Sequence, residues 1–263
     1  MSAREVLACR GVNMRFGGVD ALSGVDFTAF EDDVTSIIGP NGAGKTTLLN
    51  VISGMVSPQA GTVRLSNLDL TGLPPHERGR AGVVRTFQNL EIFGNMNVLE
   101  NVLTGCHRHV EYSFVDGLFR TPRYKREEKR LRELALEKLE FVGLAEKAEL
   151  PASELPFGNQ RLLELARAIA AEPDLLLLDE PAAGLNMKET RELESIIRRV
   201  RDELKISIVL VEHDMDLVMS ISDNVTVLNY GRVIAVGEPR EIQKDPEVIT
   251  AYLGVEEDEG VSA

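Results

Sequence analysis

Cysteine, long apolar runs and positive charge are all scarce in this sequence. The two cysteines, Cys9 and Cys106, belong to no CxxC pair, so neither a disulfide framework nor a zinc site is predicted. No apolar run approaches the ~20 residues that cross a bilayer, and the N-terminus lacks the continuous apolar core of a signal peptide. Lys and Arg total 29 against 42 Asp and Glu, and the net charge of −13 disfavours a general nucleic-acid binder. We therefore expect a soluble globular protein of a reducing compartment.

Short apolar runs alternate with segments of helical periodicity along the 263 residues. Residues 34–38 (VTSII), 175–178 (LLLL) and 206–211 (ISIVLV) are typical of strands buried on both faces of a parallel sheet. Residues 225–236 resemble a hairpin that turns near Tyr230 and Gly231. The N-terminal region and residues 61–68 alternate like antiparallel strands, and residues 95–170 are mostly helical. This pattern predicts an α/β fold with a mostly parallel core sheet, an antiparallel β subdomain and a helical subdomain.

A glycine-rich loop follows the first of these strands. Residues 39–47 read GPNGAGKTT and match the pattern G-x-x-x-x-G-K-[ST]. Glycines let backbone N–H groups approach phosphate oxygens, and the helix that follows presents its positive N-terminal end to the same anion. In such a loop the Lys45 ammonium reaches the β- and γ-phosphates, and the Thr46 hydroxyl ligates Mg²⁺. By itself this motif fits kinases, GTPases, helicases and transport ATPases. The predicted phosphate site consists of Gly39, Pro40, Asn41, Gly42, Ala43, Gly44, Lys45, Thr46 and Thr47.

Two carboxylates follow the apolar run of residues 175–178. They would lie at the carboxyl end of a buried strand, where ligands bind in open α/β sheets. Asp179 is placed there to hold Mg²⁺ and Glu180 to polarise an attacking water molecule. The alternative is an acidic pair that only stabilises the N-terminus of the next helix through its dipole.

Five segments follow one another in a fixed order along the chain: GPNGAGKTT (39–47), TFQN (86–89), LPFGNQRLLELARA (155–168), LLLLDEPAAGLN (175–186) and VEHD (211–214). In this order they resemble the ABC ATPase family over nearly the whole chain. The resemblance implies a P-loop NTPase fold of ABC type over residues 1–254, with the helical subdomain (about 95–170) inserted in the core and an acidic flexible tail over 255–263. Two further segments, FGGVDAL (16–22) and DPEVITAYLG (245–254), narrow the resemblance to the ATPase subunit of branched-chain amino-acid importers.

The resemblance also implies roles for particular residues. Phe16 falls where the family places an aromatic ring that stacks on adenine, although core packing is an alternative for it. Gln88 is similar to the glutamine that contacts Mg²⁺ and senses the γ-phosphate, and His213 to the switch histidine. The implied catalytic set is Lys45, Gln88, Glu180 and His213, and the implied metal ligands are Thr46, Gln88 and Asp179. The implied signature residues, which face the ATP held by an opposite subunit, are Phe157, Gly158, Asn159 and Gln160.

The sequence departs from the family pattern at two positions. Pro156 stands where the signature normally has a serine, and proline offers neither a hydroxyl nor a backbone N–H. We expect the composite ATP site that uses this signature to be slower than one with serine. Asn186 replaces the usual aspartate of the segment that joins the two ATP sites, so it stays polar but loses a charge.

The resemblance implies a Mg²⁺-dependent ATPase that energises an importer of branched-chain amino acids or related solutes at the cytoplasmic face of the inner membrane. ATP would be bound in a head-to-tail dimer with a second ATPase subunit, which could be paralogous or identical. The other expected partners are integral-membrane permease subunits and, indirectly, an extracytoplasmic solute-binding protein; nucleic acid is not expected. The alternatives are a non-transport ABC ATPase, as in DNA repair or translation, and a regulatory nucleotide switch.

A basic and aromatic segment is left without a role by these assignments. Residues 107–132 hold eight Lys and Arg against four Asp and Glu, a local net charge of +4, together with Tyr112, Phe114, Phe119 and Tyr124. The segment could face a permease or anionic lipid headgroups. Equally, it could be a solvated helix whose neighbouring aromatics pack inward.

Overall fold

The computed structural model describes residues 4–110, 112–113, 116 and 118–258, with side chains described up to residue 252. The chain forms two compact units. Unit 1 consists of residues 1–85, 174–183 and 197–263, and unit 2 of residues 86–173 and 184–196. Unit 2 thus contains the segment 95–170, in which the sequence predicts a helical insertion, together with flanking residues on both sides.

A six-stranded sheet forms the core of unit 1, and its central strands are the short apolar runs of the sequence. Strands β3 (Val34–Ile38), β7 (Leu175–Asp179) and β8 (Ser207–Val211) are buried along their whole length, as expected for strands covered on both faces. The neighbours β9–β3, β3–β8, β8–β7 and β7–β6 are parallel, and β10 adds an antiparallel edge. The remaining strands are β6 (Val83–Arg85), β9 (Asn224–Asn229) and β10 (Arg232–Gly237), in the order β10-β9-β3-β8-β7-β6.

The predicted antiparallel subdomain is a second sheet of unit 1. Its order is β2-β1-β4-β5, and both β1–β2 and β1–β4 are antiparallel. Buried residues of this sheet, among them Leu7, Val25 and Val63, share one apolar cluster with Ile37 and Leu177 of the parallel sheet. The four strands are β1 (Glu5–Phe16), β2 (Val19–Phe30), β4 (Ala60–Leu65) and β5 (Leu68–Asp69).

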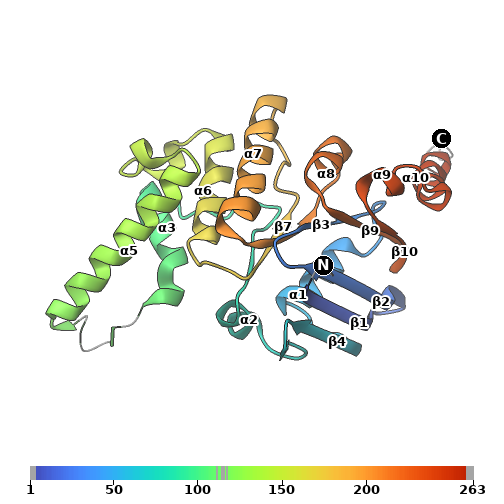
Figure 1. The fold of residues 1–263 in the computed structure, drawn as a ribbon, viewed down its shortest axis with the longest axis horizontal. Helices are drawn as coiled ribbons and strands as arrows, with labels where there is room; N and C mark the ends of the chain where they lie inside the picture. Colours follow the sequence, from blue (N-terminus) through green and yellow to red (C-terminus); the bar gives the residue numbers. More distant parts are fainter. Residues whose placement is uncertain (1–3, 111, 114–115, 117, 259–263) are drawn as a thin grey trace. The chain divides into compact units, whose positions relative to one another are not determined.

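The helices of unit 1 include α1, which starts at the glycine-rich loop, and three helices near the C-terminus. Figure 1 shows α8, α9 and α10 following one another beside β9 and β10. Helix α7 passes from unit 2 into unit 1 at Ile197. The bounds are α1 (Lys45–Ser53), α2 (Pro75–Ala81), α7 (Met187–Leu204), α8 (Met215–Ile221), α9 (Pro239–Ile242) and α10 (Pro246–Asp258).

Unit 2 is helical where the structure describes it. Helix α5 contributes Leu131, Ala135 and Leu139 to its interior, which is the apolar stripe at i, i+4 and i+8 that the sequence contains. The packed elements are α3 (Val98–Gly105), α5 (Pro122–Phe141) and α6 (Phe157–Ile169), with the 3₁₀ turns η1 (Cys106–His109), η2 (Ala145–Lys147) and η3 (Ala152–Glu154).

Three further predictions from the sequence can be compared with the structure. Both cysteines are free and buried, one in each unit. Helix α10 extends to Asp258, so residues 255–258 of the segment expected to be a flexible tail are helical, because extending an existing helix costs little; residues 259–263 lie outside the described residues. Among the described residues, no helix is both long enough and apolar enough to span a membrane.

Candidate functional site

Two glycines make the phosphate loop possible. Gly39 has a φ of 149°, and a Cβ on it would lie 2.0 Å from the Leu228 carbonyl oxygen. Gly44, which caps α1, has a φ of 105°, and its Cβ would lie 2.6 Å from the Ala21 carbonyl oxygen. Neither position can hold a larger residue without a shift of the backbone. The loop therefore runs against β9 and β2 in a conformation that only glycine allows.

Lys45 lies inside this loop. Its Nζ donates hydrogen bonds to the carbonyl oxygens of Gly39 (2.7 Å) and Pro40 (3.0 Å), and the residue is buried. Burial lowers the pKa of Lys45, while the nearby carboxylates of Glu180 and Asp179 oppose that shift. The Lys45 ammonium thus places a positive charge inside the glycine-rich loop, and this arrangement is suited to binding phosphate.

The loop opens into a pocket of about 340 Å³. Most of the predicted phosphate site lines this pocket, and two predicted catalytic side chains, Glu180 and His213, line it from the ends of β7 and β8. Sequence reasoning missed Val19 and Tyr230, which also line it and are 70% and 81% exposed. The complete lining is Val19, Asp20, Ala21, Asn41, Gly42, Ala43, Gly44, Lys45, Thr46, Thr47, Glu180, His213 and Tyr230.

Glu180 and His213 contact each other directly in this pocket. The His213 Nε2 and the Glu180 Oε1 are 2.7 Å apart, although the residues are 33 positions apart in sequence. Glu180 has a φ of 48°, an unusual value for a residue with a side chain, and its N–H donates to the Val211 carbonyl of β8. Such a backbone conformation costs of order 1–3 kcal/mol and persists because its surroundings impose it. In this backbone conformation the Glu180 carboxylate reaches the His213 ring.

Asp179 has a partner that the sequence did not indicate. Its Oδ2 accepts a hydrogen bond of 2.7 Å from Arg85, and both side chains are almost fully buried. Arg85 also donates to Asn50 and Ser53 of α1, so it links β6, α1 and β7. The pair fixes the position of the Asp179 side chain at the end of β7, beside the phosphate loop.

Glu212 forms hydrogen bonds with both of the loops that contain Glu180 and His213. Its carboxylate accepts hydrogen bonds from the N–H groups of Ala182 (2.7 Å) and His213 (2.9 Å) and a longer one from Asp214. Burial raises the pKa of Glu212, and the three N–H donors oppose the shift. The sequence shows Glu212 as part of the segment VEHD, and no role was predicted for it. Its position directly before His213 is the one feature of the sequence that could have indicated a role.

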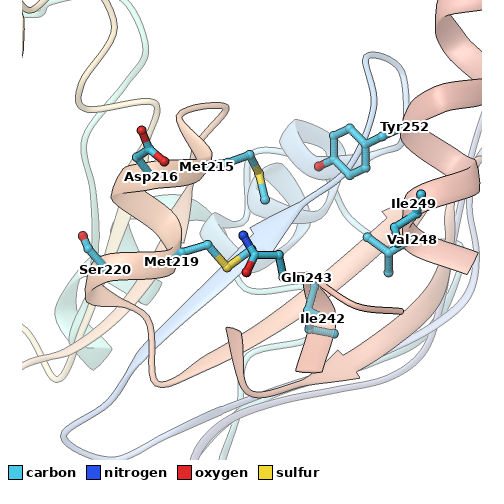
Figure 2. Close-up of a pocket in the computed structure, with 9 residues that line it drawn as sticks. All are labelled: Met215, Asp216, Met219, Ser220, Ile242, Gln243, Val248, Ile249 and Tyr252. Carbon is cyan, nitrogen blue, oxygen red and sulfur yellow. The ribbon is translucent and has the colours of Figure 1, made fainter. Parts of the chain in front are cut away.

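A second hollow of unit 1 adjoins this region. Figure 2 shows Met215 and Met219 of α8 directed toward Val248, Ile249 and Tyr252 of α10, across a space of about 580 Å³. Burial raises the pKa of Tyr252, and the backbone of Gly39, the first residue of the phosphate loop, opposes that shift.

The predicted signature residues belong to unit 2, at the start of α6. Pro156 is the N-cap of α6, with no side-chain capping bond, and Gln160 donates to the Leu155 carbonyl oxygen. Gly158 packs so closely on Glu189 that a Cβ would lie 2.6 Å from its Oε1. Phe157 is 44% exposed, and the Arg161 guanidinium lies 5.5 Å from its ring centre. Asn159 is half-buried in the first turn.

Gln88 and Asn186 also lie in unit 2. Gln88 is exposed in an irregular segment that Arg161 supports by donating to the carbonyl oxygens of Phe87 (3.2 Å) and Gln88 (2.6 Å). Asn186 caps α7, because its Oδ1 accepts from the N–H groups of Lys188 and Glu189. An aspartate at this position would accept the same hydrogen bonds. Asn186 therefore keeps the helix cap but lacks the negative charge of an aspartate.

Phe16 lies at the end of β1, paired with Val19 of β2, and is 47% exposed. It is not among the residues that line the 340 Å³ pocket, whereas Val19 is. Its exposure argues against the core-packing alternative and leaves the ring accessible at the end of β1, next to β2, whose residues line the pocket.

The chain is similar to known proteins over nearly its whole length. Residues 22–183 match the family described as ABC transporter, and residues 232–258 match the family described as branched-chain amino acid ATP-binding cassette transporter. It is 48% identical to the high-affinity branched-chain amino acid transport ATP-binding protein BraF of Pseudomonas aeruginosa, over 96% of this chain and 99% of that protein. It is 44% identical to the high-affinity branched-chain amino acid transport ATP-binding protein LivG of Escherichia coli, with the same coverage.

Solved structures agree with this assignment. The ADP conformation of MJ1267, an ATP-binding cassette of an ABC transporter, is 34% identical and covers 95% of this chain and 99% of its own, with a TM-score of 0.82. A nucleotide-free ATP-binding cassette from an ABC transporter is 33% identical over 94% of this chain and 98% of its own, with a TM-score of 0.81. The predicted α/β P-loop fold of ABC type is confirmed, and the chain belongs to the ABC transporter family as one of its ATP-hydrolysing cassettes.

Proposed function

We propose that the 340 Å³ pocket binds the phosphates of ATP and that Glu180 and His213 carry out hydrolysis there. The observation that carries this proposal is the 2.7 Å contact between His213 Nε2 and Glu180 Oε1 at the mouth of the phosphate loop. A carboxylate held by an imidazole is oriented to accept a proton from water. A switch that only binds nucleotide would have no use for such a pair, which favours hydrolysis over the regulatory alternative.

The other residues have supporting roles in this proposal. Lys45 and the N–H groups of residues 41–47 stabilise the charge on the phosphates, and Phe16 stacks on the base. His213 reports the γ-phosphate to the rest of the molecule through its contact with Glu180. Gln88 and the residues Phe157, Gly158, Asn159 and Gln160 act from unit 2, the last four on nucleotide held by a second subunit.

The residues present suit Mg²⁺. Thr46, which carries a hydroxyl, is one of the residues that line the pocket, and Asp179, which carries a carboxylate, is buried at the end of β7. These are the hard oxygen donors that Mg²⁺ prefers, and a few protein ligands suffice because phosphates and water complete its shell. We propose that Thr46 and Asp179 of unit 1 hold the ion, which would neutralise charge that develops on the phosphates. The ligand role of Gln88, which belongs to unit 2, stays the prediction that the family resemblance implies.

We further propose that hydrolysis energises the import of branched-chain amino acids or related solutes. The support is the family of the C-terminal segment and the named transport roles of BraF and LivG. The partners would be integral-membrane permease subunits, a second ATPase subunit and, indirectly, a solute-binding protein, with the chain held peripherally at the cytoplasmic face of the inner membrane. Likeness to transport proteins over 96% of the chain favours this over a non-transport role.

The substitution Glu180→Gln tests the catalytic assignment. It keeps the hydrogen bond to His213 but removes the base, so we expect ATP binding to persist and turnover to fall roughly 10²–10⁴-fold. Binding is measured with a fluorescent ATP analogue, and turnover by phosphate release from the assembled complex. Glu203→Gln, at an exposed position of α7, is the matched control and should retain full turnover. Wild-type turnover in Glu180→Gln would contradict the assignment.

The transport role is tested separately. A tagged chain is isolated from gently solubilised membranes, and the complex is placed in liposomes with radiolabelled leucine and the solute-binding protein. We expect two permease proteins and a second ATPase to copurify and uptake to require ATP. Recovery of a soluble assembly alone would favour the non-transport ABC reading while leaving the hydrolysis proposal intact.

A further inference from the structure

The two oxygens of the Glu212 carboxylate have different partners. Glu212 directly follows β8 and is only 4% exposed. Its Oε1 accepts a hydrogen bond from the N–H of Ala182 (2.7 Å), two residues after Glu180. Its Oε2 accepts from the N–H groups of His213 (2.9 Å) and Asp214 (3.4 Å). One side chain therefore joins the loop that follows β7 to the loop that follows β8.

The surroundings of this carboxylate are unfavourable for a negative charge. Burial raises the pKa of Glu212, and the nearby Glu180 carboxylate adds to that rise, while the three N–H donors oppose it. A buried charge costs much free energy unless hydrogen bonds compensate for the lost water. A neutral side chain at the end of the buried strand β8 would avoid this cost. The acid at position 212 is therefore best explained by its bonds to the two loops.

Only a carboxylate of this length can accept hydrogen bonds from both loops. A carboxylate accepts at both oxygens, whereas an amide has one accepting oxygen and one NH₂ group that only donates. A glutamine at position 212 could accept from Ala182 or from His213, and its NH₂ group would then face the N–H of the other loop. The chemistry of the side chain thus matches its two sets of partners.

The two loops carry the side chains that meet in the phosphate pocket. The His213 Nε2 and the Glu180 Oε1 are 2.7 Å apart, and the His213 side chain is 47% exposed, so packing alone does not fix its place. A bond from the Glu180 N–H to the Val211 carbonyl oxygen (2.8 Å) holds the first residue after β7. Glu212 holds the turn beyond it, at Ala182. The separation of the two loops is thus defined on both sides of Glu180.

We propose that Glu212 is a positioning residue for ATP hydrolysis, whose two carboxylate oxygens set the separation of the loops that carry Glu180 and His213. Glu212 is not among the residues that line the phosphate pocket, so it acts through those two side chains and does not touch the reacting atoms. The inference rests on the proposed function, in which Glu180 is the base and His213 orients it. A displacement of about 1 Å in such a pair can cost roughly 100-fold in rate.

The substitution Glu212→Gln tests this role because it keeps the size of the side chain and removes one acceptor. We expect kcat of the assembled complex to fall about 10- to 100-fold. The affinity for a fluorescent ATP analogue should be unchanged, since the phosphate loop is untouched, and this binding also reports folding. An unchanged kcat in Glu212→Gln would overturn the inference.

Glu241→Gln is the matched control. The Glu241 Oε2 also accepts from a backbone N–H, that of Glu238 (3.3 Å), but the carboxylate serves this one segment only. The carbonyl oxygen of a glutamine can replace it there, so kcat should remain that of the wild type. An equal loss in Glu241→Gln and Glu212→Gln would show that the effect does not come from joining the two loops.

A double-mutant cycle separates positioning from general structural support. If Glu212 acts through Glu180, Glu212→Gln should lower turnover by less than about threefold once Glu180→Gln has removed the base. Equal fold losses with and without Glu180 would mean that Glu212 acts elsewhere and would overturn the inference while leaving the proposed function intact. Wild-type turnover in Glu180→Gln alone would contradict the proposed function, and the inference would fall with it.

A crystal structure of the Glu212→Gln chain gives a readout that is independent of turnover. We expect the distance between His213 Nε2 and Glu180 Oε1 to increase beyond hydrogen-bonding range, about 3.5 Å or more. The phosphate loop should keep its conformation. A contact that stays at 2.7 Å would overturn the inference even if turnover had fallen.

Discussion

The contact between Glu180 and His213 joins two side chains that follow two different strands, and we propose that the first is the base and the second its orienting group. Their separation of 2.7 Å depends on three local features: the left-handed backbone of Glu180, the hydrogen bond from Glu180 N–H to Val211, and the carboxylate of Glu212. Each of these features fixes the path of the backbone at the point where a loop leaves a strand. The proposed chemistry therefore depends on how β7 and β8 end, because a small shift of either loop would separate the two side chains.

Arg85 makes the clearest energetic prediction for a single residue. Arg85→Gln would leave the Asp179 carboxylate buried without its cation, so we expect a loss of about 3–5 kcal/mol in the free energy of unfolding. Arg10→Gln, which breaks an exposed pair with Glu5, should cost no more than about 1 kcal/mol. Urea unfolding of the full chain without nucleotide measures both. Similar midpoints for the two variants would show that Asp179 does not depend on Arg85.

At the scale of elements, the sequence predicts the structure that neighbouring residues determine. It does not predict contacts between residues that are far apart in the chain. The strands β3, β7 and β8 and the phosphate loop were predictable because a continuous apolar run, or a loop of glycines, is decided by neighbouring residues. The Arg85–Asp179 bond joins positions 94 residues apart, and Glu212 reaches Ala182 over 30 residues. No periodicity encodes such pairs. For the same reason, no local pattern indicates that residues 184–196 belong to unit 2.

Pro156, the residue that departs from the family signature, is the N-cap of helix α6. The geometry of this N-cap determines what we expect from replacing the proline with serine. Pro156 has φ −53° and ψ 151°, an extended N-cap geometry that serine also adopts. Pro156→Ser would restore a hydroxyl able to bond nucleotide phosphate, worth roughly 1.5–3 kcal/mol for a bond to a charged group. We therefore expect ATP turnover of the assembled complex to rise about tenfold or more.

The control for this change is a second proline-to-serine substitution at a helix start. Pro151→Ser, at the N-cap of η3, makes the same change in chain flexibility away from the signature. It should leave turnover unchanged. An unaltered rate in Pro156→Ser would mean that the missing hydroxyl does not limit this site, and an equal rise in both variants would attribute the effect to flexibility.

At the scale of the whole molecule, the two cysteines report on the two units separately. Burial raises the pKa of Cys9 in β1 to about 12 and that of Cys106 in unit 2 to about 11. Because only the thiolate reacts with alkylating reagents, both thiols should stay unreactive at pH 8 until their surroundings open. The rate of labelling at each cysteine therefore measures the opening of the unit that contains it.

ATP with Mg²⁺ should separate these two rates. The phosphate loop and Cys9 belong to unit 1, so a nucleotide that binds only the closed form slows labelling of Cys9 by about 100-fold at a concentration 100 times its Kd. Cys106 should be slowed less if unit 2 opens on its own. Mass spectrometry of the two cysteine peptides after timed labelling gives both rates from the unmodified chain, and Lys45→Ala, which weakens phosphate binding, should abolish the difference. Equal slowing at both cysteines would instead mean that the units open together, and that the energy of nucleotide binding is shared by the whole cassette rather than held in the unit that contains the phosphate loop.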